Sequence, residues 1–141
     1  MNKHLVEELI PIAYITLKNN KKICVNGKIS STIKGNIASF GAAIQMGNLL
    51  SAVAFFSQQG GASEPRQELL NIILEILKEH KDIPEDCASL FVYICESKRQ
   101  EIAQIKNLVV SAAVAVKLAI NLFEPEENEE RKITKNEKVG V

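Results

Sequence analysis

Residues 108–123 read LVVSAAVAVKLAINLF, and this apolar stretch decides the fold. We project this stretch and the residues before it, from Gln100 onward, as a helix that turns 100° per residue. Its polar side chains then fall within roughly 140° of one another; they are Gln100, Gln104, Asn107, Ser111, Lys117 and Asn121. A helix that is apolar around most of its circumference lies at the centre of a bundle. The stretch therefore predicts a central helix that runs to about Phe123.

The composition of the whole chain also favours packed helices. The chain has 141 residues, enough for one domain that buries a core without a disulfide or a metal. Hydrophobic residues make up 46% of it, aromatic residues only 5%, and Trp is absent. Because Ala, Ile, Leu and Val dominate, helix packing is favoured over a β-sandwich or barrel. We predict an all-α fold, a single-domain bundle of about five to six helices.

Apolar spacing and capping signals place the other helices. The first is predicted over Lys3–Leu17, with Pro11 as a kink or a late start. Later ones are predicted from the Ser30-Ser31-Thr32 cap to about Met46, and over 49–58, 66–80 and 82–96. Ser97 and Gln100 have the spacing of a capping box for the last helix.

Two segments are predicted to lie outside the helices. Asn26-Gly27 is a strong turn signal, but the apolar runs beside it are short, so we expect a loop rather than a hairpin. From Glu124 onward charged residues predominate and core-forming residues are almost absent. We therefore predict a helical bundle domain over residues 1–123 and a charged, disordered tail over residues 124–141.

The sequence offers no recognisable catalytic or metal site. His4 and His80 are expected at the surface, and no H-E-x-x-H or C-x-x-C spacing is present. Gly60-Gly61 is not followed by the Gly-Lys-Ser/Thr of a phosphate-binding loop. Adjacent acidic pairs such as Glu7-Glu8 are typical of helix N-termini. We predict a protein that is not an enzyme and has no catalytic residues, no metal and no cofactor.

Cysteine usage and hydropathy indicate the compartment. The three cysteines are an odd number without metal or redox spacing, which is typical of buried thiols in a reducing compartment. The N-terminus lacks the pattern of a secretory signal. Residues 108–123 are interpreted as too short and too polar to span a bilayer. We therefore expect a cytoplasmic protein.

Charge is unevenly distributed in a chain whose net charge is zero. Residues 9–63 contain no Asp or Glu, yet they contain five lysines: Lys18, Lys21, Lys22, Lys28 and Lys34. Flexible cationic side chains bind phosphate backbones without reading sequence. Gln45 would add a neutral hydrogen bond. On charge alone, a solvated lysine-rich loop remains the other interpretation.

Small residues are concentrated in residues 42–57. They permit a close helix pair within the core. At helical spacing, exposed small and apolar residues would instead mark a face for a partner protein. The sequence leaves both interpretations open.

The stretch Ile44–Ser57, IQMGNLLSAVAFFS, resembles the signature segment of the small helical (fifth) subunit of the Cmr complex. That complex is the type III-B CRISPR RNA-guided effector of antiviral defence. Ile44, Leu49, Ala52, Ala54 and Phe55 are in register with the family pattern, whereas its Asn-Gly pair is reversed to Gly47-Asn48. The aliphatic run of residues 109–123 with Lys117 is similar to the family's last helix.

The resemblance implies an all-α subunit without nuclease activity. Such subunits stack beside the backbone RAMP-type subunit and beside neighbouring copies, where target RNA pairs with guide RNA. Base pairing then reads the sequence, and the protein needs only a cationic face. The expected RNA-binding residues are Lys21, Lys22, Lys28, Lys34 and Gln45, with Lys98 and Arg99 as a weaker second pair. Ile44, Leu49, Phe55 and Phe56 are the expected partner interface.

Two other classes of function remain open from the sequence. A stand-alone helical adaptor would bind a protein partner through residues 42–56 and would have no affinity for RNA. A small hydrolase or transferase with dispersed catalytic residues would carry a pocket with titratable groups, for example His80 or Glu7.

Overall fold

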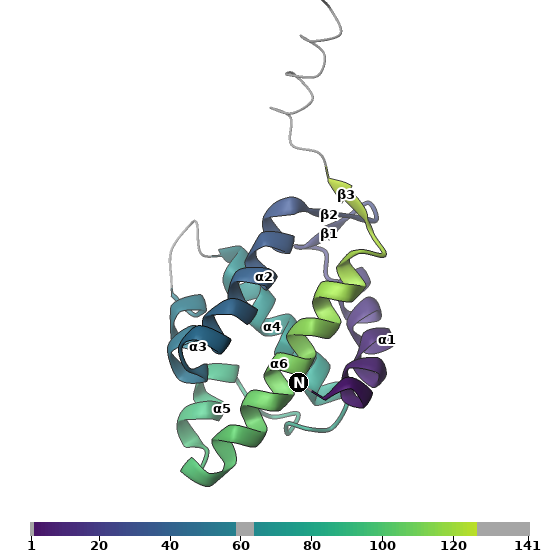
Figure 1. Ribbon diagram of the computed structural model, residues 1–141. Coiled ribbons are helices and arrows are strands. Elements are labelled where there is room, and N and C mark those ends of the chain that lie inside the picture. Colours follow the sequence, from purple (N-terminus) through teal and green to yellow (C-terminus); the bar gives the residue numbers. More distant parts are fainter. Residues whose placement is uncertain (1, 59–63, 127–141) are drawn as a thin grey trace, which may run out of the picture.

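The computed structural model describes residues 2–58 and 64–126 (Figure 1). These residues form α1 (Lys3–Asn19), β1 (Cys24–Val25), β2 (Lys28–Ser30), α2 (Ser31–Met46), α3 (Leu49–Phe56), α4 (Glu64–Glu79), α5 (Leu90–Glu96), the 3₁₀ turn η2 (Arg99–Glu101), α6 (Ile102–Ile120) and β3 (Glu124–Glu126). The all-α prediction is confirmed, with six α-helices in the described part of the chain.

Helix α6 is the centre of the bundle, as its sequence predicts. It crosses the bundle between α1 and α2, and it contacts α1, α2 and α4 (Figure 1). Its buried residues include five that are fully inaccessible apolar side chains: Val109, Ala112, Ala115, Val116 and Ala119. The alanines among them let neighbouring helices approach closely.

One helical stretch of the described residues, Arg99–Ile120, passes the length and composition test for a membrane span. The prediction of a stretch too short and too polar concerns residues 108–123, and the helix that passes the test begins nine residues earlier. In the fold, 44% of its most apolar window is buried against protein. The core helix of a globular domain passes the same test, because it too is long and apolar.

Helix α1 runs parallel to the C-terminal half of α6, and contacts join both ends of α1 to it. At one end the backbone N–H of Asn2 donates to Ser111 Oγ over 3.3 Å, and Asn2 Oδ1 caps α1. At the other end the rings of Tyr14 and Phe123 stack with centroids 5.0 Å apart. Pro11 lies inside α1, which continues through it to Asn19. Ser111 is the buried member of the predicted polar stripe, and this hydrogen bond accounts for its burial.

The loop predicted around Asn26-Gly27 is instead a short hairpin. Strands β1 and β2 pair antiparallel, with Cys24 opposite Ile29. Asn26 and Gly27 adopt φ of 54° and 76°, the left-handed conformation that a two-residue hairpin turn requires. Ile29 on β2 is fully buried and Cys24, opposite it on β1, is buried too. These two core residues anchor strands whose apolar runs are too short to predict a hairpin.

The predicted boundary at Glu124 is also wrong. Residues Glu124–Glu126 form β3, which pairs in parallel with β2 and completes a three-stranded sheet of order β1-β2-β3. The described domain therefore extends to residue 126. The remainder of the predicted tail, residues 127–141, lies outside the described residues.

The helix predicted over 82–96 begins later, at Leu90. Ser89 caps it, because Ser89 Oγ accepts a hydrogen bond from the backbone N–H of Val92. Asp82, the expected start signal, instead contacts His80 at 2.8 Å. The predicted capping box is wrong as well. Ser97 Oγ donates to the carbonyl of Tyr93 and so ends α5, and η2 and then α6 follow.

Candidate nucleic-acid interface

Four of the predicted RNA-binding residues lie at one end of the bundle, around the β1–β2 hairpin. Lys21 and Lys22 stand in the turn between α1 and β1, Lys28 is on β2, and Lys34 is in the first turn of α2. Lys21 and Lys22 are exposed, whereas Lys28 and Lys34 are partly buried. We call these four residues and the hairpin that joins them the hairpin end.

Carboxylates accompany these lysines. Lys22 Nζ lies 3.8 Å from Glu68 Oε2, and Asn20 Nδ2 donates to Glu68 Oε1 over 2.7 Å. The sheet register places Lys28 opposite Glu124. Because Lys22 is 69% exposed, its ion pair contributes only about 0–1 kcal/mol and leaves the amine accessible to a competing anion. The hairpin end is therefore cationic, and Glu68 and Glu124 offset part of its positive charge.

Gln45 does not belong to the hairpin end. It lies eleven residues beyond Lys34 along α2, which corresponds to about 16 Å at 1.5 Å per residue. It is exposed near the C-terminus of α2. A phosphate held by Lys34 would not reach Gln45, so the structure does not unite this residue with the lysines.

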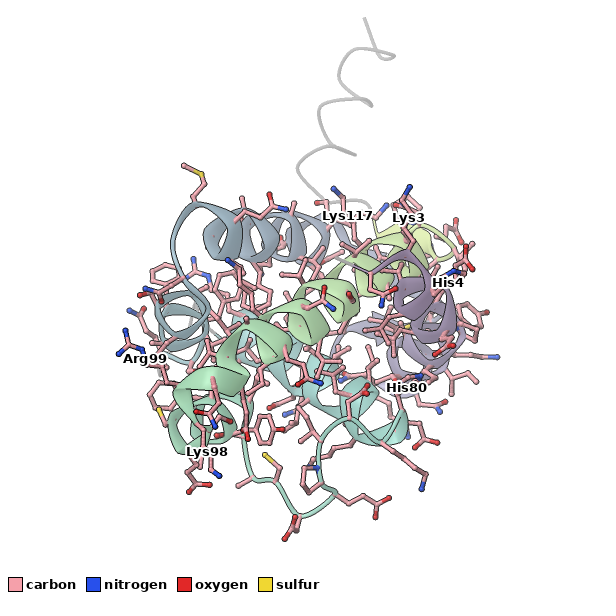
Figure 2. The ribbon with its side chains drawn as sticks, turned by 60° about the horizontal axis from the view of Figure 1, so that its bottom comes forward. Lys3, His4, His80, Lys98, Arg99 and Lys117 are labelled. Atoms are coloured by element: carbon pink, nitrogen blue, oxygen red, sulfur yellow. The ribbon has the colours of Figure 1, made fainter. Side chains whose placement is uncertain are left out.

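Lys98 and Arg99 are also separate from the hairpin end. They precede α6, whereas Phe123 and β3 follow it, and the 19 residues of α6 span about 28 Å. Figure 2 shows Lys98 and Arg99 on one side of the molecule and Lys117, Lys3 and His4 on another. Lys98 and Arg99, the weaker second pair of predicted RNA-binding residues, therefore form a basic surface separate from the hairpin end.

A groove of about 1040 Å³ lies between α1 and α4, and we call it the α1–α4 groove. Its apolar lining comes mainly from Ile12, Ile15 and Leu74. Its charged lining is mixed: Lys21, Lys22, Lys78, Glu68, Glu75, Glu79 and Glu85. Three cations against four carboxylates give the lining a formal charge of −1. Neither His80 nor Glu7 is among the residues that line it.

The predicted partner interface needs correction. Ile44, Leu49 and Phe56 are 0%, 2% and 2% exposed, so they pack in the core and are not presented to a partner. The spacing of Ile33, Ile37, Phe40 and Ile44 explains this, since they share one face of α2 that points inward. Phe55 alone is accessible, at 49%. The guanidinium of Arg66 lies 5.1 Å from its ring centroid.

The opposite side of the same two helices carries no charge. No Asp, Glu, Lys or Arg occurs between Gly35 and Gln58. Met46 is 90% exposed, Phe55 49% and Leu50 44%, and the other exposed side chains there are small or amide-bearing. We call this exposed side of α2 and α3 the uncharged face. Sequence periodicity would have identified it, because its residues lie between those of the buried stripe.

His80 joins the end of α4 to α1 through contacts that the sequence did not predict. Its Nδ1 lies 2.8 Å from Asp82 Oδ2, and its Nε2 lies 2.9 Å from Glu8 Oε2 on α1. The hydrogen bond to Asp82 raises the pKa of His80, partial burial opposes this shift, and Glu8 adds to it. No local signal could have shown the contact, because Glu8 and His80 are 72 positions apart.

The described residues show no group of three His, Cys, Asp or Glu side chains able to hold a metal ion. The cysteines are all free, but only Cys24 is buried; Cys87 is partly buried and Cys95 is exposed. The expectation of three buried thiols therefore holds for Cys24 alone.

Comparison with known proteins identifies no relative. No family model matches the chain, and no curated protein or solved structure is significantly similar to it.

Proposed function

We propose that this protein is a non-catalytic small subunit of a type III-B CRISPR RNA-guided effector, the Cmr complex, and acts in the cytoplasm. It would stack along the backbone RAMP-type subunit and beside copies of itself, without membrane contact. The resemblance of Ile44–Ser57 to the family signature supports the assignment, and an all-α fold is what that family requires.

The observation that carries RNA contact is the gathering of Lys21, Lys22, Lys28 and Lys34 at the hairpin end. They come from a turn, a strand and a helix, so the fold concentrates positive charge that the sequence spreads over fourteen positions. Lysine amines suit a phosphate backbone whose bases are already paired with a guide. Glu68 and Glu124 moderate this charge, so we expect productive RNA contact in the assembled complex, where neighbouring subunits also hold the RNA.

The assignment is tested by co-purification of the tagged protein from its native host. Mass spectrometry and nucleic-acid extraction should find RAMP-type proteins and short guide RNA. Recovery of the protein alone, or with an unrelated protein and no RNA, would overturn the proposal.

The role of the lysines is tested by charge reversal within the assembled complex. The K21E/K22E/K28E/K34E variant should weaken target-RNA binding and lower its salt dependence. Each lost contact with a phosphate of the paired strand reduces the slope of log K against log salt by about 0.9, so four contacts reduce it by about 3.6. The control variant K3E/K81E/K106E/K117E changes the formal charge equally but leaves the hairpin end intact. Equal loss in both variants would show that only net charge matters, and circular dichroism checks the fold of each.

The uncharged face favours a second candidate function, a stand-alone helical adaptor that binds a protein and not RNA. Its exposed Met46, Leu50 and Phe55 are the specific observation in its favour. An adaptor would retain its partner at high salt, because apolar contacts are not screened, and no RNA would accompany it.

A further inference from the structure

The charges of the α1–α4 groove follow an order from one end to the other. Helices α1 and α4 run antiparallel, since Asn20 contacts Glu68 and Glu8 contacts His80. Lys21 and Lys22 mark one end, where Glu68 is already bonded to Asn20 and paired with Lys22. The other end of the lining is acidic. It has three carboxylates and one cation: Glu75, Glu79, Glu85 and Lys78. Apolar Ile12, Ile15 and Leu74 add hydrophobic surface to the lining.

The sheet brings the C-terminal part of the chain to the lysine end of this groove. In one row across the sheet, Cys24 and Pro125 flank Ile29. Neighbouring strands are about 4.8 Å apart, so the backbones of β1 and β3 are about 10 Å apart. Lys21 and Lys22 directly precede β1. The described chain therefore ends, at Glu126 of β3, about two strand spacings from the strand that directly follows Lys21 and Lys22.

Residues 127–141 carry charges in the complementary order. Residues 127–130, Glu-Asn-Glu-Glu, contribute three negative charges. Residues 131–138, RKITKNEK, contribute four cations and one carboxylate around Ile133. A segment laid along the groove from β3 would therefore match its acidic part to the lysine end and its basic part to Glu75, Glu79 and Glu85.

The length of this segment is sufficient. From Glu68 to Glu79, α4 rises about 16 Å, and the separation of β3 from β1 adds about 10 Å. Fifteen extended residues span up to about 50 Å. An extended chain of fifteen residues is therefore long enough to reach from β3 along the whole groove.

We propose that the α1–α4 groove is the docking site of residues 127–141 of the same chain. Glu127, Glu129 and Glu130 pair with Lys21 and Lys22. Arg131, Lys132 and Lys135 pair with the carboxylates of the far end, and Ile133 packs against the apolar lining. The docking does not depend on the proposed RNA function. If that function holds, the docked segment covers two RNA-binding lysines and competes with RNA for them.

Zero-length carbodiimide cross-linking of the full-length protein tests the docking directly. The reagent joins an amine to a carboxylate that it touches. We expect links from Lys132 or Lys135 to Glu75, Glu79 or Glu85, and their loss in about 1 M salt, where the screening length is about 3 Å. The Lys22–Glu68 pair is an internal positive control, because its atoms are 3.8 Å apart. Formation of the control link without links from the tail would overturn the proposal. So would tail links found only in covalent dimers, since the occupant would then be a second copy.

A second measurement decides the question if the cross-linker reacts poorly. The full-length R131E/K132E/K135E variant alters no described residue, so the fold is not at risk. Its amide NMR signals for Thr16, Asn71 and Ala88, which line the groove, should shift from those of the wild type. The control variant K98E/R99E/K106E reverses three cations elsewhere and should leave these signals in place. Unchanged groove signals in the tail variant would overturn the docking. RNA is absent from both experiments, so their outcome is independent of the proposed function.

Discussion

The segment from Gly35 to Gln58 and the hairpin end are adjacent in the chain, yet different forces order them. The first has no charged residue, and its helical phase alone separates a buried side from the uncharged face. The hairpin end contains four lysines and depends on two left-handed residues, a sheet register and Glu68. Local apolar spacing thus specifies the first region, whereas contacts between distant parts of the chain specify the second.

The largest expected change in stability tests which side of α3 is buried and which is exposed. Phe55 and Phe56 are neighbours of identical chemistry, but Phe56 is 2% exposed and Phe55 49%. Phe56 also packs against Phe40, with centroids 4.9 Å apart. We expect F56A to lower the free energy of unfolding by about 3–5 kcal/mol, because it leaves a cavity in the core.

The matched control for this prediction is F55A. It removes half-exposed surface and one contact with Arg66, so it should cost about 1 kcal/mol or less. Urea denaturation of both variants measures the difference. Similar losses for the two variants would contradict the orientation of α3.

An intermediate effect tests the backbone of the hairpin end. Gly27 has φ of 76°, where a side chain is strained even though no atom lies within 4 Å of the place that a Cβ would take. We expect G27A to destabilise the protein by about 1–2 kcal/mol. The same substitution in α2, G35A, meets open space in a helix and should stabilise it by about 0.5–1 kcal/mol. Thermal or urea unfolding of the pair gives opposite signs if the hairpin is correct, and two stabilised variants would refute it.

The fold was predictable wherever apolar spacing extends over several turns. The central position of α6 and the bounds of α1 and α2 follow from such spacing. The sequence failed where a short element depends on a distant partner. Strand β3 exists because β2 lies beside it, and β2 is anchored by the single buried residue Ile29. The start of α5 was misplaced because Asp82, a good capping residue, is used by His80.

The candidate site was predictable only in part. Local charge counting identified Lys21, Lys22, Lys28 and Lys34, which the fold then gathers at one end. It could not find the Glu68 and Glu124 that lie beside them, since these are 46 positions from Lys22 and 96 from Lys28. The interface prediction chose residues because they are apolar. For the same reason Ile44, Leu49 and Phe56 are buried in the core of the protein itself. Helical phase would have selected Met46 and Leu50.

The smallest expected effect concerns a charged contact outside both regions, where His80 links α4 to α1. Its folded-state pKa is raised above 6.5 by Asp82 and Glu8, so the protonated ring stabilises the fold. This contribution is fully present below the unfolded pKa of about 6.5 and is lost as the pH rises through the folded pKa. Because Glu8 is 63% exposed, we expect about 1 kcal/mol or less. Urea midpoints between about pH 5.5 and 8.5 should therefore fall more steeply with pH in the wild type than in H80Q. The control variant H4Q also removes one histidine, but it keeps the His80 contacts and should keep the wild-type slope. Equal slopes in the wild type and H80Q would show that these contacts do not contribute to stability.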